Sequence, residues 1–249
     1  MPDKVALITG ASGGIGRATS FLAAQSGFTV GVQFHRHGDR AELIASRIRQ
    51  RGGSAFTLRA DLTVTDDVYE MFATADRHGD LAAFVNNAGA IGERSRGMKI
   101  DLARFQNSLS INLVAPFSCI KAAITSMLGH GAGGSIVNVS SFSVVTGGAK
   151  NHVDYAAAKA GLESLTRGFA TEMEGTGIRV NTVSPGSVAT GMWRGVGCAA
   201  RRRIRAGIPA RRFAMPSEIA TAIVWLILPE SRHVNGQIIR VDGGRTAPP

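Results

Sequence analysis

Seven short apolar runs alternate with longer segments of helical periodicity along this sequence. The runs expected to form strands are Val5–Thr9, Thr29–Phe34, Ala55–Arg59, Leu81–Asn86, Ser135–Ser140, Ile178–Val183 and Gln237–Val241. Helices are expected between them, at Ile15–Gln25, Arg40–Arg51, Asp66–Ala75, Leu102–Leu128, Tyr155–Met173 and Ser217–Leu228. Strands separated by helices need crossover connections, which produce a parallel sheet covered on both faces. The sequence therefore predicts an α/β fold, a doubly wound parallel sheet of the Rossmann type with about seven strands.

The 249 residues contain no internal repeat, low-complexity segment or linker-like break, so we expect a single domain over residues 1–249. The stretch Met192–Met215 differs from its surroundings, because its periodicity is weak and it contains glycines and clustered arginines. Long segments of this kind are often functional. We expect a substrate lid at about 190–213.

The formal net charge of +10 raises the question of an acidic partner. The arginines are scattered, however, and no aromatic residues interleave with the densest group, Arg201–Arg203 and Arg205, as a platform for single strands would require. A solvated surface or loop explains the charge better than nucleic-acid binding does. We expect no nucleic-acid partner, and DNA retention that falls steeply with salt would indicate otherwise.

The two cysteines, Cys119 and Cys198, are far apart and in no metal-ligand spacing, so we expect free thiols and no metal site. The N-terminus lacks the pattern of a cleaved signal. The longest apolar run, Ile219–Leu228, is far shorter than the roughly 20 residues that span a bilayer. These features predict a cytoplasmic protein without a membrane partner.

Residues 5–16 read VALITGASGGIG, an apolar strand followed by a glycine-rich turn and a helix. Glycine in such a turn permits a sharp change of direction, close approach of the backbone to a pyrophosphate, and tight packing of helix on strand. The helix N-terminus offers free N–H groups to phosphates. The spacing of Gly10, Gly14 and Gly16 differs from the usual dinucleotide fingerprint, so a plain glycine-rich surface turn is the alternative.

The second strand ends at Phe34 and is followed by His35 and Arg36, with no carboxylate at its tip. A carboxylate there would bind a ribose 2′-hydroxyl and repel a 2′-phosphate, whereas arginine attracts the phosphate. We therefore expect NADP(H) to be preferred over NAD(H). The alternative is that Arg36 is only a solvated loop residue.

Tyr155 and Lys159 are four residues apart in DYAAAKAGLESL, a good helix-forming segment, and therefore share one helix face. A nearby ammonium group favours the phenolate and can lower the pKa of a tyrosine by about 1–3 units. Such a phenol could act as an acid or base at neutral pH. An ordinary surface pair is the alternative, because this spacing arises often by chance.

Eight motifs in order along the chain resemble those of the short-chain dehydrogenase/reductase family. They are TGASGGIG (9–16), ADL (60–62), NNAG (86–89), SINL (110–113), NVSS (138–141), YAAAK (155–159), SPG (184–186) with the following Thr190, and VDGG (241–244). Within the family, the sequence is most similar to bacterial 3-oxoacyl-carrier-protein reductases and to glucose 1-dehydrogenase-like proteins. The resemblance covers essentially the whole chain.

The resemblance implies a role for each matching position. The phosphates and the adenosine ribose would be held by Thr9, Gly10, Ser12, Gly14, Ile15 and Gly16. The adenine would contact Asp61 and Leu62, while the cofactor cleft would be lined by Asn87, Ala88 and Gly89. The nicotinamide carboxamide would be seated by Pro185, Gly186, Val188 and Thr190.

The resemblance also implies a catalytic set of Asn112, Ser141, Tyr155 and Lys159. Tyr155 would move the proton, and Ser141 would bond to the substrate oxygen. Lys159 would bind the nicotinamide ribose and lower the pKa of the tyrosine. Asn112 would hold a helix kink and a water that links Lys159 to solvent; a packing hydrogen bond is the alternative for this residue.

Two ambiguities stay open within these motifs. Ser140 and Ser143 are alternatives to Ser141, although ligands of open α/β sheets do bind at the carboxyl ends of strands. The position before the second motif glycine is Gly13, where NADP-preferring members often carry a basic residue. The cofactor preference then depends on His35 and Arg36, with Phe34 in place of the acid and near the adenine edge.

The predicted reaction is hydride transfer between nicotinamide and a carbonyl or secondary alcohol, with a small-molecule or acyl-thioester substrate. A 3-oxoacyl thioester reductase fits the resemblance. The alternatives are a sugar or small secondary-alcohol dehydrogenase, or a low-turnover NADP-sensing protein. The resemblance further implies a homotetramer, with one interface on the helices near Leu102–Leu128 and Tyr155–Met173 and another that includes Gln237–Val241.

Overall fold

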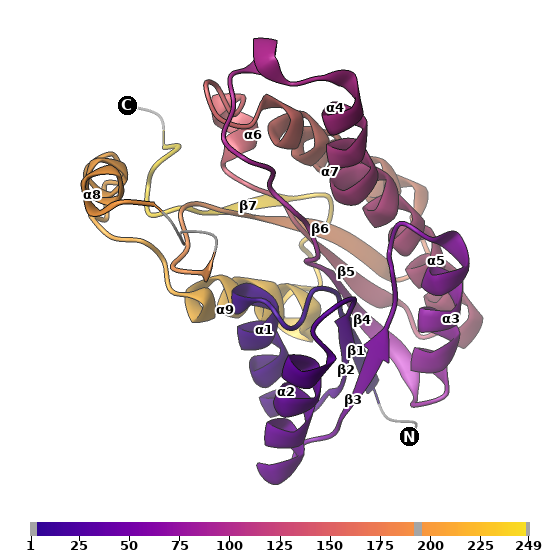
Figure 1. Cartoon of the computed structure of the whole chain (residues 1–249). Coiled ribbons are helices and arrows are strands. Elements are labelled where there is room, and N and C mark those ends of the chain that lie inside the picture. The colour runs from indigo at the N-terminus through magenta and orange to yellow at the C-terminus, as the bar shows by residue number, and fades with distance from the viewer. Residues whose placement is uncertain (1–3, 192–195, 248–249) are drawn as a thin grey trace.

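The computed structural model describes residues 4–191 and 196–247, in which seven parallel strands form one sheet (Figure 1). The strand order is β3-β2-β1-β4-β5-β6-β7, and it reverses direction between β1 and β4. The strands are β1 (Lys4–Ile8), β2 (Thr29–Phe34), β3 (Ala55–Arg59), β4 (Asp80–Asn86), β5 (Gly134–Val139), β6 (Ile178–Pro185) and β7 (Ile238–Val241). The predicted Rossmann-type fold is confirmed, and the strand bounds differ from those expected by at most two residues at either end.

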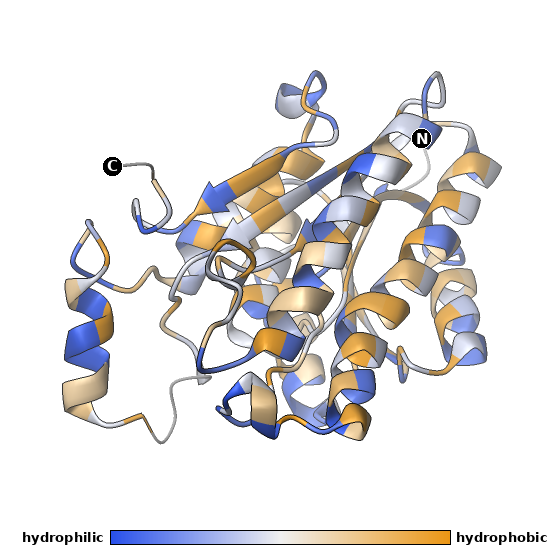
Figure 2. Ribbon diagram, turned by 90° about the horizontal axis from the view of Figure 1, so that it is seen from above, coloured by the Kyte–Doolittle hydropathy of each residue, from blue (hydrophilic) through white to orange (hydrophobic). Residues whose placement is uncertain are grey.

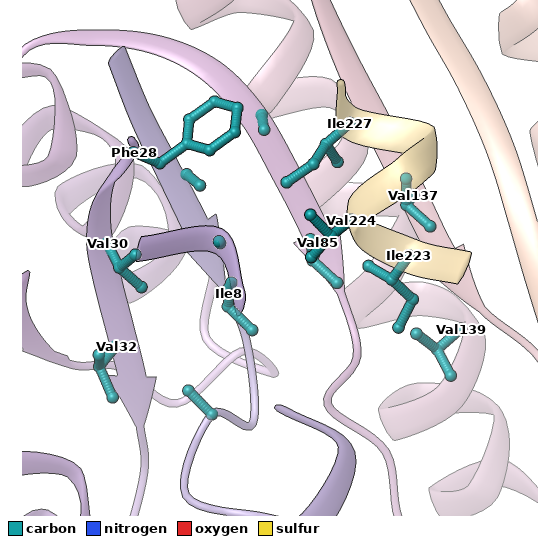
Figure 3. Close-up of a cluster of buried hydrophobic side chains, with 14 of the residues drawn as sticks. Ile8, Phe28, Val30, Val32, Val85, Val137, Val139, Ile223, Val224 and Ile227 are labelled. Carbon is teal, nitrogen blue, oxygen red and sulfur yellow. The ribbon is translucent and has the colours of Figure 1, made fainter. Parts of the chain in front are cut away.

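Helices cover both faces of the sheet, and each face has its own apolar core. One core joins the sheet to α1 (Gly14–Gln25), α2 (Gly38–Gln50) and α9 (Pro216–Ile227). The other joins it to α3 (Thr65–Asp76), α5 (Ala115–His130) and α7 (Val153–Glu172). Side chains of β1 alternate between the two, as the period of two in a strand requires. Figure 3 shows the first core, where valines of the sheet face Ile223, Val224 and Ile227 of α9.

The helix expected at Leu102–Leu128 is interrupted by one wide turn. It consists of α4 (Leu102–Leu109), a π-helical turn η2 (Ser110–Val114) that contains Asn112, and α5. By length and composition, Leu102–His130 could cross a membrane, but half of its most apolar window is buried inside the protein. Packing against the sheet and α3 accounts for that apolar character.

Four short elements were not expected from the sequence: η1 (Gly97–Lys99), α6 (Ser143–Thr146), α8 (Cys198–Ala206) and η4 (Pro229–Ser231). Helix α8 lies within the expected lid and stands away from the sheet in both views (Figures 1 and 2), and part of its ribbon is hydrophilic. A parallel bridge between Val188 and Ala214 joins the two ends of this segment. Residues 192–195 of the expected lid lie outside the described residues.

Candidate active site

The glycine turn after β1 is packed too tightly for side chains. Gly10 has a φ of +60°, and a Cβ there would lie 2.9 Å from the Cα of Ala88. A Cβ on Gly16 would lie 2.5 Å from the carbonyl oxygen of Gly10, and one on Gly14 would lie 2.9 Å from the Cγ2 of Thr190. Helix α1 starts here without a side-chain cap, so its first N–H groups are available to an anion. The turn therefore fits a pyrophosphate.

Thr9 has a different role from the one that the family resemblance implied. It is fully buried, and its Oγ1 accepts hydrogen bonds from the backbone N–H groups of Asn87 and Ala88, both at 3.0 Å. The side-chain amide of Asn87 donates a hydrogen bond of 2.8 Å to the carbonyl oxygen of Thr9. The hydroxyl of Thr9 thus joins the ends of β1 and β4.

Gln33 also positions the glycine turn, and the sequence motifs did not reveal it. Its Oε1 accepts a hydrogen bond from the N–H of Gly10 at 2.8 Å, and its Nε2 donates to the carbonyl oxygen of Ala60 at 2.9 Å. Its own carbonyl accepts from the N–H of Ala11 at 3.1 Å. The side chain is 2 % exposed. The available signal was a lone polar residue inside the apolar strand TVGVQF.

The expected adenosine end of the cleft contains a carboxylate that comes from the strand next to β2. Asp61 follows β3, and its Oδ2 lies 3.6 Å from the Nε2 of His35. Hydrogen bonds from Thr63, at 2.7 and 3.0 Å, lower the pKa of Asp61, with smaller contributions from the charges of His35 and Arg36. The positive charge beyond β2 is therefore partly offset. Phe34 packs against Gly38, the first residue of α2.

The four expected catalytic residues come from three segments. Ser141 follows β5, Tyr155 and Lys159 lie in α7, and Asn112 lies in η2. Ser141 lies close enough to Tyr155 for its hydroxyl to affect the pKa of the phenol. The Nζ of Lys159 lies 5.7 Å from the centre of the Tyr155 ring and donates a 2.8 Å bond to the carbonyl oxygen of Val139.

Burial controls the acidity of this pair. It raises the pKa of Tyr155 to about 12, against the opposing effect of the hydrogen bond with Ser141, and it lowers the pKa of Lys159 to about 8. The expectation that the lysine lowers the pKa of the tyrosine is therefore not met in this structure. Removal from water disfavours both charged forms, and the effect on the phenol exceeds any benefit from the ammonium group.

Asn112 is fully buried and connects the helix turn to the loop after β4. Its Nδ2 donates to the carbonyl oxygens of Ala90 at 2.9 Å and Ser108 at 3.0 Å, while its Oδ1 accepts from the N–H of Ala90 at 3.1 Å. A Cβ on Gly89 would lie 2.9 Å from that Oδ1 and 3.4 Å from the Nζ of Lys159. Glycine at position 89 therefore lets the asparagine and the lysine approach the same strand end.

The structure distinguishes the candidate serines. Ser140 is buried, and its hydroxyl donates to Glu163 at 2.7 Å, away from the tyrosine. Ser141 is the serine that affects the pKa of Tyr155, and its Oγ accepts a hydrogen bond from the N–H of Ser143 at 3.2 Å. The hydroxyl of Ser143 is buried and has no protein partner in the described structure. The geometry thus favours Ser141.

The end of β6 completes the cleft next to the glycine turn. Gly186 lies against β7, because its N–H bonds to the carbonyl oxygen of Val241 at 3.0 Å and a Cβ there would lie 2.7 Å from the Cα of Asp242. The carbonyl oxygen of Pro185 accepts from the N–H of Phe142 at 2.9 Å. Thr190 reaches Gly14. The expected phosphate, catalytic and nicotinamide residues are thus brought to one edge of the sheet.

A family model described as "Enoyl-(Acyl carrier protein) reductase" matches residues 10–246. The oxidoreductase YgfF of Escherichia coli K12 is 40% identical over 97% of this chain and 99% of its own. The cis-4-hydroxycyclohexanecarboxylate dehydrogenase of Sinomonas cyclohexanicum is 37% identical, with 98% and 97% covered. The 3-oxoacyl-[acyl-carrier-protein] reductase of Staphylococcus epidermidis RP62A is 32% identical, with 97% and 98% covered.

This chain belongs to the short-chain dehydrogenase/reductase family. A solved structure titled as a putative NAD(P)-dependent gluconate 5-dehydrogenase from Beutenbergia cavernae, with bound NADP, agrees with it at a TM-score of 0.91 and 33% identity, covering 98% of this chain and 97% of that one. The resemblance found in the sequence is confirmed. The protein is an oxidoreductase that acts on CH–OH and C=O groups, and its family uses NAD(H) or NADP(H). Within residues 4–191 and 196–247, no cluster of His, Cys, Asp or Glu could hold a metal.

Proposed function

We propose that this protein interconverts a carbonyl and a secondary alcohol with NADP(H), and that Tyr155 is the general acid and base. The placement of Tyr155 beside the buried ammonium group of Lys159, near Ser141 at the end of β5, carries this proposal. These groups lie at the carboxyl edge of the sheet together with the glycine turn. Ligands of open α/β sheets bind at this edge.

The phenol of Tyr155 is protonated at neutral pH and can therefore donate its proton in carbonyl reduction, although burial, which raises its pKa to about 12, makes it a weaker acid than an exposed tyrosine. Ser141 would hold the substrate oxygen and share in stabilising its developing negative charge. The ammonium of Lys159 would offset the charge left on the phenolate. The bound nicotinamide would supply or accept the hydride.

NADP(H) over NAD(H) is supported by Arg36, which is exposed just beyond β2 and whose charge could pair with a 2′-phosphate. Asp61 opposes this preference, because its lowered pKa keeps a negative charge 3.6 Å from His35. The bonds from Thr63 to Asp61 turn that carboxylate toward its own loop. We expect the net preference to remain with NADP(H).

The substrate belongs to the family's range of carbonyls and secondary alcohols. A 3-oxoacyl thioester fits the likeness to the carrier-protein reductase, and a small hydroxy acid fits the names of the cyclohexanecarboxylate and gluconate dehydrogenases. We propose that the segment at about 190–213, closed at its base by the Val188–Ala214 bridge, acts as the substrate lid. NADPH consumption with 3-oxoacyl thioesters, diketones, quinones, oxidised sugars and cyclic oxo acids separates these options.

A homotetramer is also proposed, with one interface on the long helices α4, α5 and α7. Large apolar side chains are exposed along α4, η2 and α5: Leu102, Val114, Phe117 and Leu128. Burying such a row in a subunit contact would remove it from water. Light scattering coupled to size exclusion tests this assembly, and a mass of one chain would contradict it.

The variant Tyr155→Phe tests the catalytic proposal. It removes the phenolic proton but keeps the ring, so turnover should fall by several orders of magnitude while NADPH binding stays within about threefold of the wild type. Initial rates are measured with the best substrate of the panel, and NADPH binding is measured by fluorescence titration. Near-normal turnover in this variant would overturn the assignment.

A further inference from the structure

Polar atoms without partners are concentrated beside Tyr155. In the described structure, four buried side-chain nitrogen or oxygen atoms have no hydrogen-bond partner, and three of them belong to Ser143, His152 and Asp154. All three residues lie in the segment that connects Ser141 to Tyr155. An unpaired buried polar group costs stability, so such groups tend to mark a place where a ligand or water completes the bonding.

One glycine brings Ser143 and His152 together. The N–H of Gly148 donates to the carbonyl oxygen of Ser143 at 3.1 Å, and the N–H of His152 donates to the carbonyl oxygen of Gly148 at 2.8 Å. Ser143 is bonded through its own N–H to the hydroxyl of Ser141. His152 is the residue directly before α7, three positions before Tyr155. The unpaired groups of Ser143 and His152 thus both belong to the short segment between Ser141 and Tyr155.

A cation is held next to them by the loop after β4. The N–H of Ser95 donates to the carbonyl oxygen of Asn151 at 2.8 Å, so Arg94 lies next to His152 across this contact. Arg94 is exposed and has no hydrogen bond or ion pair among the described residues. Burial lowers the pKa of His152; Asp154 opposes this, while the charges of Arg94 and Arg104 add to it. Arg94 therefore supplies charge, and the neutral imidazole supplies a hydrogen bond.

The neighbouring carboxylate is already neutralised. The Oδ2 of Asp154 accepts a 3.0 Å bond from the Nε of Arg104, and the Nη2 of Arg104 donates to the carbonyl oxygen of Glu93 at 2.6 Å. The guanidinium group of Arg104 is thus already paired with other groups of the protein. On the loop itself, Arg94 and Arg96 outnumber the single exposed acid, Glu93. The surroundings of His152 are left with a net positive charge.

We propose that Arg94, His152 and Ser143 form a subsite for a carboxylate on the substrate, so that this enzyme acts on small hydroxy acids and oxo acids. Arginine matches a carboxylate with forked, charge-assisted hydrogen bonds, and the imidazole and hydroxyl add neutral ones. This inference rests on the proposed function, because the subsite would bind a group of the substrate that takes no part in hydride transfer.

A binding experiment tests the subsite without any turnover. Calorimetry with the NADP⁺-bound enzyme compares cyclohexanecarboxylate with the uncharged cyclohexanecarboxamide. We expect the carboxylate to bind at least tenfold more tightly, which corresponds to about 1.4 kcal/mol. Arg94→Met should remove that difference, Arg94→Lys should retain part of it, and Ser143→Ala should weaken carboxylate binding a few-fold.

Lys99→Met is the matched control, because it removes one exposed positive charge from η1, five residues away along the same connection. It should change carboxylate binding by less than twofold. Equal binding of the acid and the amide, or an equal effect of Lys99→Met and Arg94→Met, would overturn the subsite. Melting temperatures of all variants verify that the protein remains folded.

Kinetics separate this inference from the proposed function. With 4-oxocyclohexanecarboxylate and its methyl ester, Arg94→Met should lower kcat/KM at least tenfold for the acid, mainly through KM, and leave the ester unchanged. Equal reduction of both ketones by the wild type would contradict the proposed subsite but agree with the proposed oxidoreductase function. Selective carboxylate binding without reduction of any ketone in the wider panel would support the subsite but contradict the proposed reaction.

Discussion

Gln33→Leu is the substitution for which the structure gives the most definite expectation. The side chain of Gln33 is almost completely buried and connects the N–H of Gly10 to the carbonyl oxygen of Ala60. Leucine has a similar size but can make neither bond. Each backbone group left unpaired costs about 1–3 kcal/mol, and the apolar side chain recovers about 1.5–3 kcal/mol. The two groups together cost about 2–6 kcal/mol, so after this recovery the free energy of unfolding should fall by about 0.5–3 kcal/mol.

Two measurements follow from this estimate. For a chain of this length, each kcal/mol lowers the melting temperature by about 2–4 °C, and urea denaturation followed by circular dichroism gives the loss directly. Because Gly10 would lose the bond that fixes its N–H, we expect the Kd for NADPH to rise at least tenfold. This second effect tests positioning of the glycine turn, which stability alone does not report.

The matched control is Gln50→Leu, which makes the same chemical change at an exposed position at the end of α2. It should alter stability by less than about 0.5 kcal/mol and leave NADPH binding unchanged. A Gln33→Leu protein with wild-type stability and wild-type NADPH affinity would refute the reasoning. Lower stability with unchanged affinity would show that the turn keeps its conformation without this residue.

Three further outcomes are expected. Carbonyl reduction should slow as pH rises through about 8, because Lys159 loses its proton there while Tyr155, with a pKa of about 12, stays protonated; a pH profile of kcat/KM checks this, and a flat profile to pH 10 would contradict it. Arg104→Met should destabilise the protein by about 3 kcal/mol, since it leaves the buried carboxylate of Asp154 unpaired; urea denaturation measures the loss, and wild-type stability would count against the pair. Arg36→Ala should weaken NADPH binding about tenfold and leave NADH binding unchanged, as measured by fluorescence titration; an equal effect on both cofactors would exclude a 2′-phosphate contact.

The pKa of Lys159 also predicts how stability depends on pH. Its folded value, about 8, lies below its ordinary value of 10.5, so between these two pH values the unfolded chain binds more protons than the folded one. Stability should therefore rise with pH across this window as far as Lys159 is concerned. Tyr155 acts in the opposite direction at higher pH, because its folded pKa lies above 10. The contribution of Lys159 thus raises stability in the range where carbonyl reduction slows, so a loss of activity there is distinguishable from unfolding.

The strands and main helices could be predicted from the sequence because their apolar periodicity is set by the two cores. Val30 and Val32, for example, both face the α1, α2 and α9 side, as a strand period of two requires. Helix α8 could not be predicted in this way. It has no buried residue, and four arginines replace the apolar stripe. The sequence of this helix therefore has no hydrophobic periodicity from which a helix could be predicted.

Prediction of the site from the sequence is limited by contacts between residues that are far apart in the chain. The motifs placed Ser141, Tyr155 and Lys159 in one group, and the structure brings them together. Thr9 belongs to a motif as well, yet its hydroxyl is used inside the protein. Such a difference depends on which way a side chain turns at a strand end, and neither periodicity nor spacing contains that information.

Asp61 shows why charge at a cofactor site has to be counted over neighbouring strands. Adjacent parallel strands end at the same edge, so the residue after β3 reaches the space beyond β2 although 26 positions separate Asp61 from His35. No acidic residue directly follows β2, which favours a 2′-phosphate. Asp61, which follows β3, nevertheless places a carboxylate in the same space. Selectivity for NADP(H) then depends on whether Arg36 binds the phosphate or pairs with Asp61. The hydrogen bonds from Thr63 favour the first outcome, because they occupy one oxygen of Asp61 within its own loop.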